Sequence, residues 1–120
     1  MIDRFHDEVD TWMLACFGED IPFDKVERNH RFIEEALELV QAFNMPKADA
    51  LALVEYVYGR PVGEPIQEVG DVMVTLAALC SAQDFNLSTA AMMEIDRVQG
   101  KIDEIRAKQA AKPKFSALPM

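Results

Sequence analysis

The chain has 120 residues, of which half are apolar and 28% are charged, as is typical of a soluble globular protein with one core. It carries 12 Lys and Arg against 21 Asp and Glu, a net charge of −9. Such a chain lacks the clustered cations that hold nucleic-acid phosphates or an anionic membrane surface. Nucleic acid and membrane are therefore excluded as partners, and a polyanionic ligand is expected to bind together with cations.

The two cysteines, Cys16 and Cys80, stand in unrelated contexts without CxxC or CxxH spacing. This excludes a cysteine-based zinc site and a disulfide framework. It favours two buried free thiols in a reducing compartment over a single bridge. The N-terminal sequence MIDRFHDEVD has no apolar signal-peptide core, and the longest nearly apolar run, residues 72–82, is too short to span a bilayer. A cytoplasmic location is expected.

Proline and glycine divide the sequence into helical blocks, and no stretch alternates as a half-buried strand does. The apolar spacing predicts helices over residues 3–17, 25–43, 47–58, 64–83 and 89–108. Asp24 and Ser88 are the expected N-caps of the second and fifth helices. No internal repeat is recognised. The fold class is therefore all-α, a single domain of four or five helices over residues 1–108, with residues 109–120 as a loosely held tail.

Two acidic clusters differ from the other acidic residues, which fit solvated helix faces. Glu34, Glu35 and Glu38 lie within one turn of the second predicted helix, where like charges repel. Arg31 can relieve them from the preceding turn, so a solvated face remains possible for this cluster alone. Glu68 and Asp71 form the second acidic cluster.

The Glu68 and Asp71 pair directly precedes residues 72–80, which are apolar on nearly every side and predict a helix buried all round. Ionised carboxylates beside a buried segment need a cation or several donors. Glu35 and Glu38 can face this pair from another helix, which makes four convergent carboxylates. All-oxygen ligation of this kind suits Mg²⁺, with Mn²⁺ as a possible substitute.

The pattern Glu35-x-x-Glu38 followed by Glu68-x-x-Asp71 resembles the all-α nucleoside triphosphate pyrophosphohydrolases, in particular their MazG-like branch. The segment RFIEEALELVQA is similar to the first motif helix of that family, and EPIQEVGDVMVTLAAL to the second. The resemblance covers residues 28–106. It implies hydrolysis of the α–β phosphoanhydride of an NTP or dNTP, which gives the monophosphate and pyrophosphate.

The same resemblance implies the residue roles. Glu35, Glu38, Glu68 and Asp71 would bind Mg²⁺, and Glu34, just before the first motif, would activate the attacking water. Arg97 and Lys101, which are helical neighbours on the next helix, would meet the phosphates. The family fold completes its bundle between subunits, so a homodimer or a higher homo-oligomer is expected.

Three other interpretations of the sequence remain open. A di-iron carboxylate bundle would use Glu27-x-x-His30, but no second ExxH is present. A non-enzymatic helical interaction module would carry the acidic stripe only as a solvated face. Within the family, a phosphoribosyl-ATP pyrophosphohydrolase has similar motifs. Trp12 and Phe17 could stack on a nucleobase, although a place in the core is favoured for both.

Overall fold

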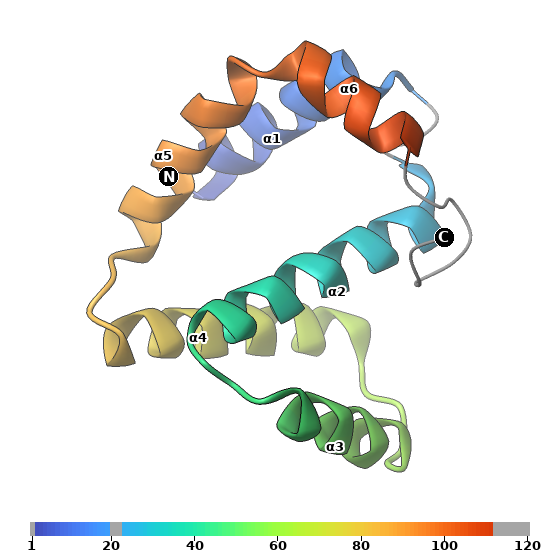
Figure 1. Ribbon diagram of the computed structural model, residues 1–120, viewed down its shortest axis with the longest axis vertical. Coiled ribbons are helices and arrows are strands. Elements are labelled where there is room, and N and C mark those ends of the chain that lie inside the picture. Colours follow the sequence, from blue (N-terminus) through green and yellow to red (C-terminus); the bar gives the residue numbers. More distant parts are fainter. Residues whose placement is uncertain (1, 20–22, 112–120) are drawn as a thin grey trace. The chain divides into compact units, whose positions relative to one another are not determined.

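The computed structural model describes residues 2–19 and 23–111, and in these residues it contains helices and turns and no strand (Figure 1). The predicted all-α class is confirmed. The six helices are α1 (Ile2–Phe17), α2 (Lys25–Ala42), α3 (Lys47–Tyr58), α4 (Pro65–Ala82), α5 (Leu87–Gln99) and α6 (Ile102–Ala111). None of them combines the length and apolarity that a membrane crossing requires.

Local capping chemistry explains where the helices begin. The Asp24 carboxylate accepts a hydrogen bond from the Glu27 backbone N–H at 3.1 Å, which confirms the predicted cap of α2. Pro65 occupies the first turn of α4, where no N–H partner is needed. The expected Ser88 cap is wrong, because α5 begins at Leu87, two residues before the predicted start, and the Asn86 side chain accepts from the Thr89 N–H at 2.8 Å.

The single helix predicted over residues 89–108 is two helices in the structure. α5 ends at Gln99, and Gly100 and Lys101 separate it from α6. The apolar spacing continues across this break, so periodicity alone could not reveal it. α6 extends to Ala111, past the predicted end at Lys108, and residues 112–120 of the predicted tail lie outside the described part of the chain.

The chain divides into two compact units. The first unit comprises Met1–Arg31 and Phe85–Met120, and in it α1 packs against α5 and α6 (Figure 1). Among the described residues of this unit, the buried side chains are Cys16, Glu27, Ile95 and Val98.

The second unit is Phe32–Asp84, which holds the end of α2 together with α3 and α4. All of it is described, and none of its residues is buried. The prediction that the helix around residues 72–80 is buried all round is therefore wrong for the isolated chain, where Val74 is 70% exposed. A helix that is apolar on most sides can be buried only where other surfaces cover those sides, and the second unit offers too few of its own.

Two helix–turn segments in the structure match one another at a spacing of 40 residues. α2 and α4 both have 18 residues, and each is followed by a four-residue turn that leads into the next helix. In each turn the second residue has a positive φ, 70° at Asn44 and 62° at Asp84. The backbone bonds also match, since Phe43 and Gln83 both donate to the carbonyl four residues before them. The structure thus contains the same turn geometry twice, in a sequence in which no internal repeat is recognised.

Candidate metal-binding site

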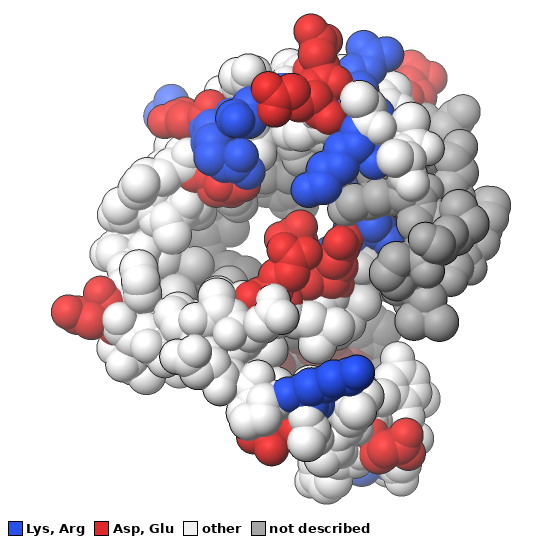
Figure 2. Space-filling model, viewed as in Figure 1, with Lys and Arg blue, Asp and Glu red and all other residues white. Residues whose placement is uncertain are grey.

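Three carboxylates converge on one side of α2. Glu34, Glu35 and Glu38 each offer an oxygen, and these oxygens lie within 4.8 Å of one another. Helix geometry explains the arrangement, because residues three and four apart are neighbours on a helix surface. Glu34 is half-buried and the other two are exposed. Figure 2 shows acidic surface gathered over α2, where these residues lie.

The spacing and chemistry of this group fit a hard divalent cation. Mg²⁺ binds oxygen ligands at about 2.1 Å in an octahedron, so its ligand oxygens lie roughly 3.0–4.2 Å apart. The oxygens of the three α2 carboxylates lie within 4.8 Å of one another, a spacing that exposed acidic groups also commonly have without an ion. Glu34, expected to activate water, lies in the same group as Glu35 and Glu38, the expected metal ligands. An ion held here would keep positions open for water and for phosphate oxygens.

Glu68 and Asp71 lie on α4, three residues apart on one side of that helix, and both are exposed. They are not part of the group that the three α2 carboxylates form. The Glu68 carboxylate lies against Gly63, where a Cβ would overlap with it. The structure therefore brings together three of the predicted acidic residues and leaves the α4 pair apart from them.

The exposure of Glu68 and Asp71 removes one reason to expect a cation beside them. Carboxylates beside a buried helix lose their hydration and need a cation in its place. In the isolated chain both side chains are accessible to water, so desolvation does not by itself require a metal there. Their candidacy as ligands now depends on the motif spacing alone.

Arg97 and Lys101, the expected phosphate-binding residues, lie in the first unit at the end of α5 and in the corner that follows it. The Arg97 guanidinium donates to both oxygens of Glu94, at 2.8 and 2.6 Å. This hydrogen bonding holds the pKa of the Glu94 carboxyl below its ordinary value. The Lys101 ammonium lies 3.8 Å from the Glu104 carboxylate. Each cation thus pairs with an acidic neighbour on its own segment.

Glu27 is a buried acidic residue that the sequence did not distinguish from a solvated one. Its side chain is only 2% exposed, and its Oε1 lies 3.4 Å from Arg31 and 3.8 Å from Arg28. The available signal was the i, i+4 spacing of Glu27 and Arg31 on the face that continues into Glu34 and Glu38. This pairing with arginines does not support a di-iron site, and His30 belongs to no metal-binding group among the described residues.

Trp12 and Phe17 contact one another within the first unit. Their rings meet edge to face, with centroids 5.8 Å apart and an interplanar angle of 81°. The Arg28 guanidinium lies 5.6 Å from the centroid of the Phe17 ring and also donates to the Met13 sulfur. Both residues are half-buried, so the two rings pack at the edge of the core.

Comparison of the chain with protein-family models, with curated proteins and with solved structures finds no match.

Proposed function

We propose that this protein is a Mg²⁺-dependent nucleoside triphosphate pyrophosphohydrolase that converts an NTP or dNTP to the monophosphate and pyrophosphate. The observation that best supports the proposal is the convergence of Glu34, Glu35 and Glu38 oxygens within 4.8 Å on α2. The spacing of Glu68 and Asp71 on α4, in the same compact unit, adds the second half of the motif. The acidic charge of the chain also agrees with a substrate that binds together with its cations.

In this proposal each group has one task. Glu35 and Glu38, with Glu68 and Asp71, would hold Mg²⁺, and the ion would supply neutralisation of phosphate charge and Lewis-acid polarisation of the phosphorus–oxygen bond. Glu34 accepts a proton from the attacking water as the new bond to the α-phosphorus forms. The bond from that phosphorus to the bridging oxygen breaks, and its electron pair leaves with pyrophosphate. Arg97 and Lys101 bind phosphate oxygens of the substrate.

The test measures pyrophosphate release from a panel of NTPs and dNTPs with Mg²⁺, for the wild type and for Glu38→Gln and Asp71→Asn. Both variants should keep the helical circular dichroism spectrum and lose turnover. Glu55→Gln is the matched control, because Glu55 is an exposed acid of α3 in the same unit. Wild-type rates in both site variants would overturn the metal assignment.

A second candidate function is a non-enzymatic helical interaction module. The exposure of α3 and α4 favours it, since neither helix has a fully buried residue. This candidate predicts no pyrophosphate release from any nucleotide. It also predicts that neutralising both Glu68 and Asp71 leaves thermal stability unchanged with and without Mg²⁺.

We also propose that a second copy of this chain covers α4. At 100° per residue, Ile66, Val69 and Met73 lie within about 60° of one another, on the side of α4 opposite Glu68 and Asp71. Their exposed fractions are 80%, 66% and 42%. An apolar strip of this kind, separate from the acidic side, is the pattern expected for a self-complementary interface.

Sedimentation equilibrium tests the dimer. The wild type should have twice the mass of the 13.5 kDa chain. Val69→Glu should shift it to monomer, whereas Thr75→Glu, on the acidic side of the same helix, should leave it dimeric. A monomeric wild type at micromolar concentration would contradict this assembly without affecting the test of pyrophosphate release.

A further inference from the structure

The corner between α5 and α6 is built around the backbone carbonyl of Val98. In a continuous helix this carbonyl would accept from the N–H of Ile102, four residues on. Here α5 has already ended, and the carbonyl accepts from the Lys101 N–H at 3.1 Å in a tightened turn. It also accepts from the Trp12 indole N–H at 3.2 Å. The Gly100 N–H also donates to this carbonyl, so the indole adds a donor from a residue 86 positions away to the local bonds of the corner.

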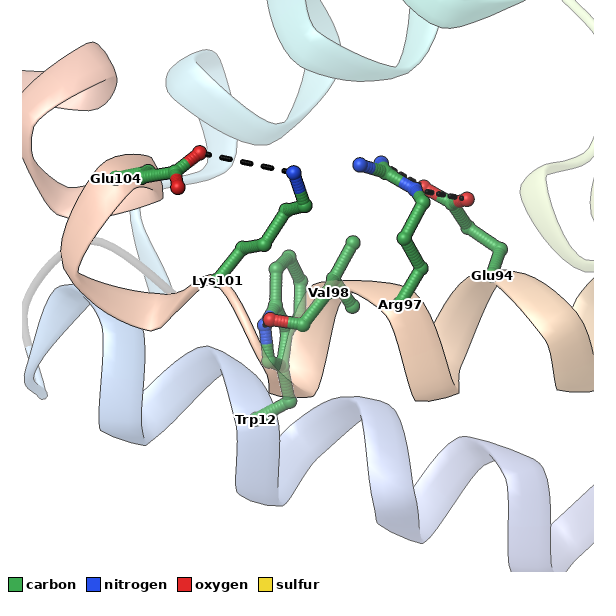
Figure 3. Close-up of polar contacts among 6 residues, drawn as sticks. All are labelled: Trp12, Glu94, Arg97, Val98, Lys101 and Glu104. Atoms are coloured by element: carbon green, nitrogen blue, oxygen red, sulfur yellow. Dashed lines mark hydrogen bonds and ion pairs between the residues drawn. The ribbon is translucent and has the colours of Figure 1, made fainter.

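Arg97 directly precedes Val98 in the sequence, and Lys101 follows it by three positions. Figure 3 shows the Arg97 guanidinium and the Lys101 ammonium extending to the same side of α5, away from α1. Trp12 reaches Val98 from the opposite side, where α1 lies. The direction of Lys101 relative to Arg97 is therefore decided by the corner that the indole helps to hold.

The indole itself is held in place by packing. The indole ring meets the Phe17 ring edge to face. The Arg28 guanidinium lies over the Phe17 ring, 5.6 Å from its centroid. Val98, the acceptor residue, is only 8% exposed. A rigid donor and a buried acceptor give the corner a defined geometry, which a flexible polar side chain would not provide.

We propose that Trp12 is a positioning residue for phosphate binding. Its N–H bond to Val98 sets the α5–α6 corner so that Arg97 and Lys101 together bind one diphosphate group. This inference rests on the proposed function, in which these two cations meet the substrate phosphates. It adds a residue of α1 that contacts neither the phosphates nor the acidic group.

The test compares the wild type with Trp12→Phe, which retains an aromatic ring and removes the donor. Inorganic pyrophosphate with Mg²⁺ is the calorimetric probe. The variant should bind it about tenfold more weakly, as expected for the loss of one hydrogen bond that holds the binding geometry. In turnover, KM should rise by a similar factor while kcat stays unchanged. General destabilisation of the protein would not change KM alone.

Two further variants separate positioning from stability. Ile95→Val weakens the same core without touching the indole bond and should bind pyrophosphate as the wild type does. Lys101→Met should weaken pyrophosphate binding to a still measurable level, and adding Trp12→Phe to it should cause no further loss, because the aligned cation is already gone. Since Trp12 is the only tryptophan, its fluorescence should change on pyrophosphate binding in the wild type and not in Lys101→Met.

The outcomes distinguish the inference from the function on which it rests. Equal pyrophosphate affinity in the wild type and Trp12→Phe would overturn the positioning role, and pyrophosphate release by the wild type would still support the enzyme. An additive loss in the double variant would also overturn it. A wild type that binds no pyrophosphate with Mg²⁺ would overturn the phosphate role of Arg97 and Lys101, and the inference with it.

Discussion

Asn44 and Asp84 are equivalent residues, 40 positions apart, and both adopt the left-handed conformation, with φ of 70° and 62°. Each is the second residue of the turn that follows an 18-residue helix. The N–H of Asn44 donates to the Gln41 carbonyl, and that of Asp84 donates to the Ser81 carbonyl. Asn and Asp tolerate this conformation better than most residues with a side chain. The two turns therefore end α2 and α4 with the same backbone geometry.

The turns lead to a prediction about stability. Asn44→Ala and Asp84→Ala should each lower the free energy of unfolding by about 1 kcal/mol, because a Cβ without a short polar group is strained at positive φ. Glycine at either position should stay within about 0.5 kcal/mol of the wild type, since relief of strain offsets the greater entropy of the unfolded chain. Urea unfolding followed by circular dichroism measures both effects. Equal stability of the alanine and glycine variants would contradict the strain argument.

Ile95 is predicted to be a main determinant of stability in the first unit. It is 4% exposed, so Ile95→Ala should lower the free energy of unfolding by about 2–4 kcal/mol through lost burial and a residual cavity. Met93, on the same helix and 67% exposed, is the control. Met93→Ala should change stability by less than about 0.5 kcal/mol. Similar losses in the two variants would show that the core lies elsewhere.

The two free thiols should differ in reactivity. Cys16 is 2% exposed, and burial raises the pKa of its thiol, so both access and the thiolate fraction are reduced. Cys80 is only partly buried. In native protein at pH 8, the Cys80→Ser variant, which retains Cys16, should react with a thiol reagent at least about tenfold more slowly than Cys16→Ser. In denaturant the two variants should react alike, and a fast native reaction of Cys16 would contradict its burial.

The Glu94 and Arg97 pair predicts a specific pH response. Because the hydrogen bond from Arg97 lowers the pKa of Glu94 from its ordinary value of 4.5, the pair stabilises the folded state above the unfolded pKa. That contribution is lost as the pH falls through the lowered folded pKa, and it is small because the Glu94 side chain is 58% exposed. A carboxyl NMR titration should place the Glu94 pKa below 4.5 and show it rising in Arg97→Met. An unchanged value in that variant would assign the shift to another group.

The sequence by itself determined the helical elements and the acidic face of α2. Apolar periodicity, proline and the Asp24 cap are local signals, and they placed most helix ends within one or two residues of those observed. The approach of Glu34 to Glu38 is equally local, because helix geometry makes residues four apart neighbours. Nothing beyond the helix itself was needed to predict it.

Only the tertiary structure decided which residues are covered. It buried Glu27 beside Arg31, joined Trp12 to Val98 and left α4 exposed in the isolated chain. It also kept Glu68 outside the α2 carboxylate group. Periodicity tells which side chains share a face, but burial depends on which other surface packs against that face. Contacts between residues far apart in the chain therefore lie beyond what local spacing can predict.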